Sequence, residues 1–194
     1  MSKKNTAIFL FDDVEVLDFA GPFEVFSVTN ELNHYSMLNV YTVARKKGPV
    51  KARNGLSVNP DFGVQEAPRP DFLIIPGGIG SRAVLGQDDV ISWIRASACT
   101  AEKVMSVCTG SLLLAKAGLL EGARATTHHE VFDELAVLAP NTEIVRNERF
   151  VDNGQIITSG GISAGIDMSL HVIEQVYGKE TAQKTAAYME YRCV

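Results

Sequence analysis

The fold of this chain is decided by VMSVCTGS, residues 104–111, and by the apolar run Leu112 to Ala117 that follows it. The β-branched residues before Cys108 are typical of a buried strand, and the small residues after it predict a tight turn that opens a helix. The thiol would stand at the carboxyl end of the strand, where free N–H groups and the helix dipole both favour a thiolate. We therefore predict a nucleophile elbow with a lowered pKa at Cys108. The alternative is a buried cysteine that only fills the end of a strand.

Segments on both sides of the elbow alternate between strands and helices. Apolar runs predict strands at residues 6–11, 37–44, 71–75, 103–107, 143–146, 150–151 and 155–158. Helical spacing predicts helices at residues 21–32, 88–98, 109–117, 129–138, 164–177 and 179–191, the first opened by Gly21-Pro22. Asn54-Gly55 predicts a hairpin between residues 50–52 and 56–58. This order is typical of an α/β protein with a doubly wound, mostly parallel sheet and helices on both faces, and we expect one domain over residues 1–194.

Composition excludes several classes of protein. With 46% hydrophobic residues the chain can form a large core, and 18 basic against 23 acidic side chains give a net charge of -5. Because no basic run is longer than Arg45-Lys46-Lys47, we expect no nucleic-acid partner. The apolar stretch near the N-terminus is too short for a signal peptide or a membrane span, which predicts a cytoplasmic protein with no membrane partner.

The cysteines point to the same compartment. Cys99, Cys108 and Cys193 are an odd number, and their spacings fit neither a disulfide framework nor a zinc site. We therefore expect free thiols in a reducing environment, with no metal bound.

Three loops are expected to meet at one edge of the sheet. The loop after the first predicted strand carries Asp18, and the glycine-rich loop after the third buried strand carries Gly77 and Gly78. In doubly wound sheets ligands bind beyond the carboxyl ends of the strands, where the elbow also places Cys108. We expect these residues to form one site. Because Asp18 precedes Gly21-Pro22, its alternative role is that of a helix N-cap.

Five motifs carry a family resemblance. In chain order they are VLDFAGPFEVF at 16–26, IIPGG at 74–78, VCTGS at 107–111, ATTH at 125–128 and TSGGISAGID at 158–167. Together they resemble the ThiJ/PfpI superfamily, whose fold is flavodoxin-like, of the class I glutamine amidotransferase type, and the resemblance spans residues 7–191. The Leu-Asp-x-x-Gly-Pro and Cys-Thr-Gly-Ser motifs are most similar to the isocyanide (isonitrile) hydratase branch. The motifs also resemble the sensor domains of AraC-type transcription regulators.

The resemblance implies a chemistry that suits these side chains. An isocyanide carbon needs one soft nucleophile and one proton donor close together. We expect Cys108 to attack the carbon as a thiolate and Asp18 to protonate it. Water activated by Asp18 would then hydrolyse the thioimidate to an N-substituted formamide, with no cofactor. Partial burial and the neighbouring thiolate are expected to raise the pKa of Asp18.

Other residues are predicted to bind the substrate. Backbone N–H groups of Gly77 and Gly78 could stabilise an anion, although a tight turn also explains the glycines. Thr109 could hold a water or the substrate nitrogen, or it could simply be capped within its helix. The resemblance places His128 near the pocket without making it the base, and Ile162 is expected to touch the substrate. It also implies a homodimer.

Three classes of function remain open. The first is a hydratase for isocyanides, the second is a glyoxalase or deglycase acting on 2-oxoaldehydes, and the third is a non-catalytic small-molecule or redox sensor. Asp18 in place of a glutamate and Thr109 in place of a histidine favour the first over the second. The presence of both Cys108 and Asp18 favours an enzyme over a sensor.

Overall fold

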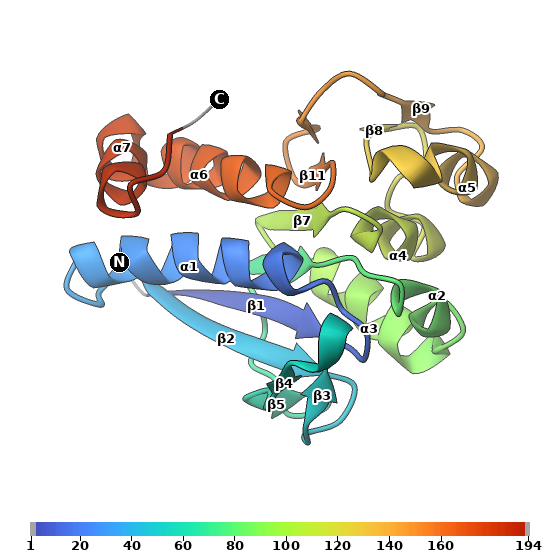
Figure 1. Ribbon diagram of the computed structural model, residues 1–194, viewed down its shortest axis with the longest axis horizontal. Helices are drawn as coiled ribbons and strands as arrows, with labels where there is room; N and C mark the ends of the chain where they lie inside the picture. Colours follow the sequence, from blue (N-terminus) through green and yellow to red (C-terminus); the bar gives the residue numbers. More distant parts are fainter. Residues whose placement is uncertain (1–2, 193–194) are drawn as a thin grey trace.

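A seven-stranded sheet forms the centre of the computed structural model, which describes residues 3–192 (Figure 1). Its strands, in chain order, are β1 (Lys4–Leu10), β2 (Leu38–Ala44), β5 (Phe62–Gly63), β6 (Phe72–Ile75), β7 (Lys103–Val107), β10 (Phe150–Asp152) and β11 (Ile156–Ser159). Across the sheet the order is β10-β11-β7-β6-β1-β2-β5. Every neighbouring pair is parallel except β10 and β11. The predicted, mostly parallel sheet is confirmed.

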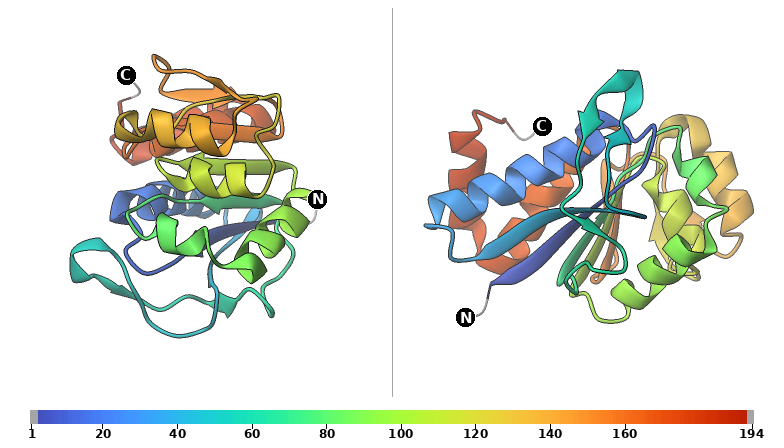
Figure 2. Two further views of the ribbon diagram at one scale, coloured as in Figure 1. Left: turned by 90° about the vertical axis from the view of Figure 1, so that its right-hand side faces the viewer. Right: turned by 90° about the horizontal axis from the view of Figure 1, so that it is seen from below.

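Helices cover both faces of this sheet, as Figure 2 shows in its right-hand view. On one face lie α1 (Val16–Leu32), α6 (Ala164–Tyr177) and α7 (Lys179–Tyr188), and on the other lie α2 (Ser81–Val84), α3 (Asp88–Ala98), α4 (Gly110–Lys116) and α5 (Phe132–Leu138). Side chains of β6 are fully buried because helices lie on both sides, which explains why this strand is apolar throughout. The fold is therefore the flavodoxin-like, doubly wound α/β fold that the sequence predicts.

The start of α1 differs from its prediction. The helix begins at Val16 rather than at Gly21, and Pro22 lies inside it. Proline there removes only one N–H, the one that would pair with the carbonyl of Asp18. Gly21 instead lets α1 approach α6 closely, because a Cβ atom at this position would lie 2.9 Å from Cγ1 of Ile166 in α6. The Gly-Pro pair thus marks the crossing of α1 and α6.

Short elements complete the fold. The predicted hairpin is present: β3 (Val50–Lys51) pairs antiparallel with β4 (Ser57–Val58), and the turn η1 (Arg53–Gly55) joins them. The helix predicted at 129–138 is divided into η2 (His129–Val131) and α5. The strand predicted at 143–146 is shorter, since only β9 (Glu143–Ile144) pairs, with β8 (Arg124–Ala125), in a separate small sheet. The sequence prediction missed β5, β8 and α2, which have two to four residues each and carry no periodic pattern.

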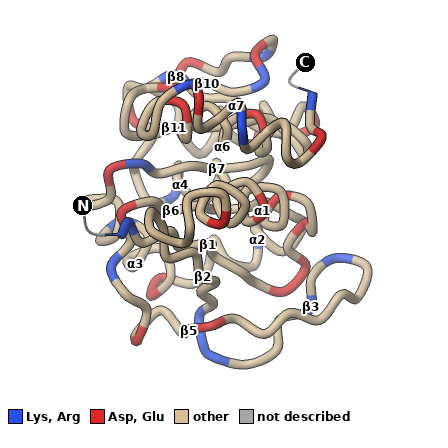
Figure 3. The backbone as a smooth tube through the Cα atoms, turned by 90° about the vertical axis from the view of Figure 1, so that its left-hand side faces the viewer, with Lys and Arg blue, Asp and Glu red and all other residues tan. Residues whose placement is uncertain are grey.

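The surface carries charges of both signs. Lys and Arg residues alternate with Asp and Glu residues along the backbone in Figure 3. Among residues 3–192, no helix has the length and apolar character needed to cross a membrane. Cys99 is exposed and Cys108 is buried, and both are free thiols as predicted, whereas Cys193 lies outside the described residues.

One glycine next to the elbow is expected to tolerate no side chain. A Cβ atom at Gly110 would lie 2.0 Å from the carbonyl oxygen of Ile75 at the end of β6. We predict that Gly110→Ala lowers the free energy of unfolding by about 3 kcal/mol, measured by urea denaturation. The control is Gly86→Ala, whose new Cβ would come no closer than 3.7 Å to its nearest neighbour, the oxygen of Ala83. Equal stability of the two variants would contradict the close approach of α4 to β6.

Candidate active site

Cys108 occupies a strained turn between β7 and α4. Its φ angle is 54°, in the left-handed region that side chains other than glycine rarely adopt. Its N–H donates to the carbonyl oxygens of Ser159 and Gly160, at 3.2 Å each. Its own carbonyl oxygen accepts from Oγ1 of Thr127 at 2.9 Å and from Oγ of Ser111 at 3.2 Å. The backbone thus forms the tight turn that the sequence predicts, and four hydrogen bonds hold it against a strain of roughly 1–3 kcal/mol.

Asp18 lies in the first turn of α1 and is completely buried. Its Oδ2 accepts a hydrogen bond from the N–H of Gly77 at 3.0 Å. The residue at the N-cap position is Glu15, so the alternative that Asp18 caps the helix is wrong. The second oxygen, Oδ1, is buried without a well-formed hydrogen bond to any described residue. One carboxyl oxygen is therefore anchored to the backbone and the other is left for chemistry.

The carboxyl group and the thiol influence each other. Burial raises the pKa of Asp18 to about 7, the Gly77 N–H opposes this rise, and the charge of Glu15 adds to it. Burial also raises the pKa of Cys108 to about 12, and the charge of Asp18 adds to this shift, while the N–H of Thr109 opposes it. The direct interaction of the carboxyl group with the thiol lowers the pKa of Asp18 and raises that of Cys108. The two groups therefore titrate as a pair.

The predicted direction of the Cys108 shift is wrong. We expected the start of the helix to lower the thiol pKa, but burial and a neighbouring carboxylate raise it. The helix α4 has only seven residues, and the amide of Thr109 alone contacts the sulfur favourably. The raised pKa of Asp18 agrees with its prediction, although burial and Glu15 cause it rather than a thiolate. At neutral pH the pair holds a thiol beside a partly ionised carboxyl group.

The glycine loop holds these groups in place. The N–H of Gly78 donates to Oγ1 of Thr109 at 2.9 Å, and this hydroxyl donates to the carbonyl of Gly78 at 3.0 Å. Ser81, which the sequence analysis missed, donates to the same oxygen at 3.2 Å. These bonds fill the capacity of the Thr109 hydroxyl. The N–H groups of Gly77 and Gly78, expected to face a substrate, instead bind protein side chains, so both glycines position Asp18 and Thr109.

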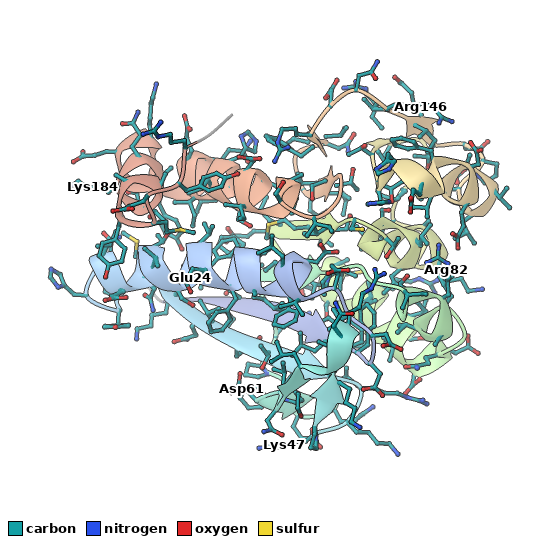
Figure 4. The ribbon with its side chains drawn as sticks, viewed as in Figure 1. Glu24, Lys47, Asp61, Arg82, Arg146 and Lys184 are labelled. Carbon is teal, nitrogen blue, oxygen red and sulfur yellow. The ribbon has the colours of Figure 1, made fainter. Side chains whose placement is uncertain are left out.

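A cavity of about 340 Å³ lies over the thiol. Five predicted site residues line it, namely Cys108, Thr109, Gly78, His128 and Ile162, whereas Asp18 and Gly77 lie behind its wall. The sequence analysis missed the remaining lining residues, which are Glu15, Arg53, Ile79, Arg82, Glu130 and Val131. Glu15, Arg53 and Ile79 lie in loops and turns, Arg82 in the four-residue helix α2, and Glu130 and Val131 in η2. Only the glycines beside Ile79 mark such a residue in the sequence. Figure 4 labels Arg82 on α2.

The side chain of His128 lies at the cavity without contacting the thiol. Its Nδ1 accepts a hydrogen bond from the N–H of Glu130 at 3.3 Å, and its ring lies 4.3 Å from that of His129. Burial and the charge of His129 lower the pKa of His128, so the ring is neutral at pH 7. No hydrogen bond joins it to Cys108 within residues 3–192. In the same part of the chain, no group of three or more His, Cys, Asp or Glu side chains is arranged to hold a metal ion.

Comparisons with known proteins identify the family of this chain. The model of the DJ-1/PfpI family matches residues 4–175. The chain is 36% identical over 182 residues to isonitrile hydratase of Pseudomonas putida, covering 94% of this chain and 76% of that protein. It is 30% identical over 171 residues to the HTH-type transcriptional regulator GbdR of Pseudomonas aeruginosa, covering 88% of this chain and 46% of the regulator. The chain thus spans about half the length of that regulator.

A solved structure shows the same architecture. The crystal structure of a ThiJ/PfpI family protein from Pseudomonas syringae superposes with a TM-score of 0.89 at 28% identity, covering 100% of this chain and 77% of that one. Fold and site together define an α/β protein with a cysteine at the turn between a central strand and its helix. The chain belongs to the DJ-1/PfpI family, as its motifs indicate.

The buried carboxyl group predicts a pH-dependent stability. Because the pKa of Asp18 is about 7 in the folded protein and its ordinary value is 3.8, wild-type stability falls as the pH rises from 4 to 7. We predict that Asp18→Asn is more stable than wild type at pH 8 by on the order of 2 kcal/mol, a figure discounted for coupling to Cys108. At pH 4 the difference should vanish.

Urea denaturation at both pH values measures this difference. The control is Asp133→Asn, which removes an exposed carboxylate from α5 and should leave no comparable pH-dependent gain. A wild-type protein more stable than Asp18→Asn at pH 8 would show that the carboxylate is well solvated or better paired than the structure indicates.

Proposed function

We propose that this protein is a cysteine-dependent hydratase that adds water to an isocyanide and releases an N-substituted formamide. The observation that carries the proposal is the pairing of the Cys108 thiol with the buried carboxyl group of Asp18 at one end of a cavity. The 36% identity to an isonitrile hydratase supports it. Because both described cysteines are free, we propose the reducing cytoplasm as its compartment.

The first step moves one proton from sulfur to carbon through the carboxylate. Ionised Asp18 accepts the proton of the Cys108 thiol while Sγ forms a bond to the terminal carbon of the isocyanide. The electron pair that develops on this carbon takes the proton back from Asp18, which gives a thioimidate. This route starts from the thiol, in keeping with its raised pKa, and replaces attack by a preformed thiolate.

The second step hydrolyses the thioimidate. Asp18, again ionised, accepts a proton from a water molecule as the water oxygen adds to the thioimidate carbon, and passes this proton to the nitrogen. Asp18 then takes the second proton of that water from the new hydroxyl group. The C–S bond then breaks, the formamide leaves, and the sulfur regains a proton from Asp18. The N–H of Thr109 supports the departing thiolate, since it already interacts favourably with this sulfur. Over the two steps, one isocyanide and one water molecule are converted into one N-substituted formamide.

The other classes of function lack such support. A glyoxalase or deglycase with a Cys-His pair needs a histidine within reach of the thiol, and His128 makes no hydrogen bond with Cys108 among the described residues. The likeness to the regulator GbdR keeps a sensor role as the runner-up. A buried, coupled acid and thiol is destabilising, and ligand binding alone does not require it.

We predict that formamide production depends on both partners of the pair. With an aryl isocyanide as substrate, Cys108→Ala should lose more than about a thousandfold in kcat, and Asp18→Asn about a hundredfold or more. Cys99→Ala, which removes an exposed thiol remote from the cavity, is the control and should retain full activity. Circular dichroism checks that each variant folds. Lactate from methylglyoxal without any formamide would support the glyoxalase alternative, and inactivity with both substrates would support the sensor.

The proposed proton path also predicts the pH dependence. Because the base is ionised Asp18, kcat/KM should rise with pH through an apparent pKa of about 7, which belongs to the coupled pair. Initial rates at subsaturating isocyanide from pH 5 to 9 measure this profile. A rate that falls through the same range would mean that Asp18 must start protonated and that the thiolate attacks first.

A further inference from the structure

Two carboxyl groups at the start of α1 bind partners outside their own helix. Glu15 is at the N-cap position and Asp18 lies three residues later, a spacing at which two side chains are neighbours. In a capping box, side chains at these two positions bind N–H groups of their own helix. Here the N-cap side chain makes no such hydrogen bond; the carboxyl group of Glu15 accepts from Arg53, and that of Asp18 accepts from Gly77.

One glycine fixes the positions of both residues. The N–H of Glu15 donates to the carbonyl oxygen of Gly77 at 2.9 Å, and the N–H of Gly77 donates to Oδ2 of Asp18 at 3.0 Å. The first turn of α1 is thus attached to the end of β6 by two hydrogen bonds. This attachment limits how far the two carboxyl groups can move apart.

Arg53 holds the Glu15 carboxylate at the cavity. Its Nη1 donates to Oε2 of Glu15 at 3.1 Å, and its N–H donates to the carbonyl oxygen of Val14 at 2.9 Å. A further hydrogen bond, from the N–H of Asp13 to the carbonyl oxygen of Lys51 at 2.7 Å, attaches the β3–β4 hairpin to the same loop. Glu15 and Arg53 both line the cavity, and the Glu15 side chain is only 18% exposed. Water therefore screens its charge less than that of a surface carboxylate.

The charge of Glu15 acts on both reacting groups. Burial is the main cause of the raised pKa of Asp18, and Glu15 adds to this rise. Burial and the charge of Asp18 raise the pKa of Cys108, and Glu15 again adds to the shift. A negative charge beside a carboxyl group favours the protonated form. Glu15 therefore makes ionised Asp18 a rarer species at neutral pH.

The other charges around the cavity are paired or well solvated. Arg82 pairs with Glu134 at 2.6 Å. Glu130 has a side chain that is 74% exposed and lies 3.9 Å from Nδ1 of His128. Burial lowers the pKa of His128 and Glu15 opposes this shift, so the ring stays neutral at pH 7 when the charge of Glu15 is removed.

We propose that Glu15 is a positioning residue for the hydration: its carboxylate, held at the cavity by Arg53, opposes the ionisation of Asp18 and thereby sets the working pH range and the strength of this base. The inference rests on the proposed hydratase function, because it concerns the proton acceptor of that reaction. A carboxyl group that ionises less readily is the stronger base once it is ionised. Glu15 therefore lowers the rate at low pH and raises it at high pH.

The pH profile of Glu15→Gln tests this role. The variant keeps the size of the side chain and the N–H that binds Gly77, but it carries no charge. We expect the apparent pKa of kcat/KM with an aryl isocyanide to fall by about 0.5–1 unit. The variant should be about twofold faster than wild type at pH 6 and about twofold slower at pH 9. A merely structural role of Glu15 would lower the rate at both pH values.

Three further variants separate charge from other causes. Glu15→Asp keeps the negative charge and should show the wild-type profile. Glu24→Gln removes an exposed carboxylate further along α1, labelled in Figure 4, and should leave the apparent pKa unchanged. Circular dichroism checks folding at each pH. If Glu15→Gln does not fold, Glu15→Ser takes its place, since serine is an uncharged residue favoured at the N-cap.

Titration without turnover distinguishes failure of this inference from failure of the hydratase proposal. The 13C signal of the Asp18 carboxyl group, assigned by its absence in Asp18→Asn, should titrate at lower pH in Glu15→Gln than in wild type. If it does and no isocyanide is hydrated, the hydratase proposal fails and the effect of Glu15 on Asp18 stands. If isocyanides are hydrated, the inference is overturned by an unchanged apparent pKa in Glu15→Gln, by an equal shift in Glu24→Gln, or by a slower rate at every pH. The absence of both hydration and the shifted titration overturns both.

Discussion

The N–H of Gly77 donates to Oδ2 of Asp18, and this hydrogen bond anchors a carboxyl group in the interior of the protein. It joins the end of β6 to the first turn of α1, and the same loop is joined to the elbow through Gly78 and Thr109. The three carboxyl-end loops are therefore one hydrogen-bonded unit. This unit fixes the position of Oδ1, the oxygen that the proposed proton transfer uses.

The rest of the fold offsets the free-energy cost of the backbone strain and of the buried carboxyl group in this unit. The left-handed backbone of Cys108 is held by the neighbouring β11 loop, and α4 begins in close contact with the end of β6. Both the strained turn and the buried carboxyl group oppose folding, and the stability of the sheet with its two helical layers offsets them. This is the usual balance between stability and activity at a preorganised site.

Much of the fold could be predicted from the sequence, and particular residues show why. The spans of α3, β7 and α6 agree with their predictions to the residue, because each carries the apolar pattern of its element and Gly178 ends α6. The start of α1 was not predictable, since Gly21 serves a contact with Ile166, which is remote in the sequence. The convergence of Asp18, Cys108 and the glycine loop follows from topology alone. The raised thiol pKa and the lining arginines depend on burial and on loop geometry, which a local pattern does not contain.

The raised pKa of Cys108 also bears on the reactivity of this thiol toward other electrophiles. Peroxides and alkylating metabolites react with thiolates far faster than with thiols, so a cysteine that stays protonated at neutral pH is a poor target for them. In the proposed hydration, the sulfur becomes nucleophilic only while the isocyanide carbon receives its electron pair and the carboxylate of Asp18 takes its proton. Between such encounters, burial and the neighbouring carboxylate keep the sulfur in its less reactive, protonated form.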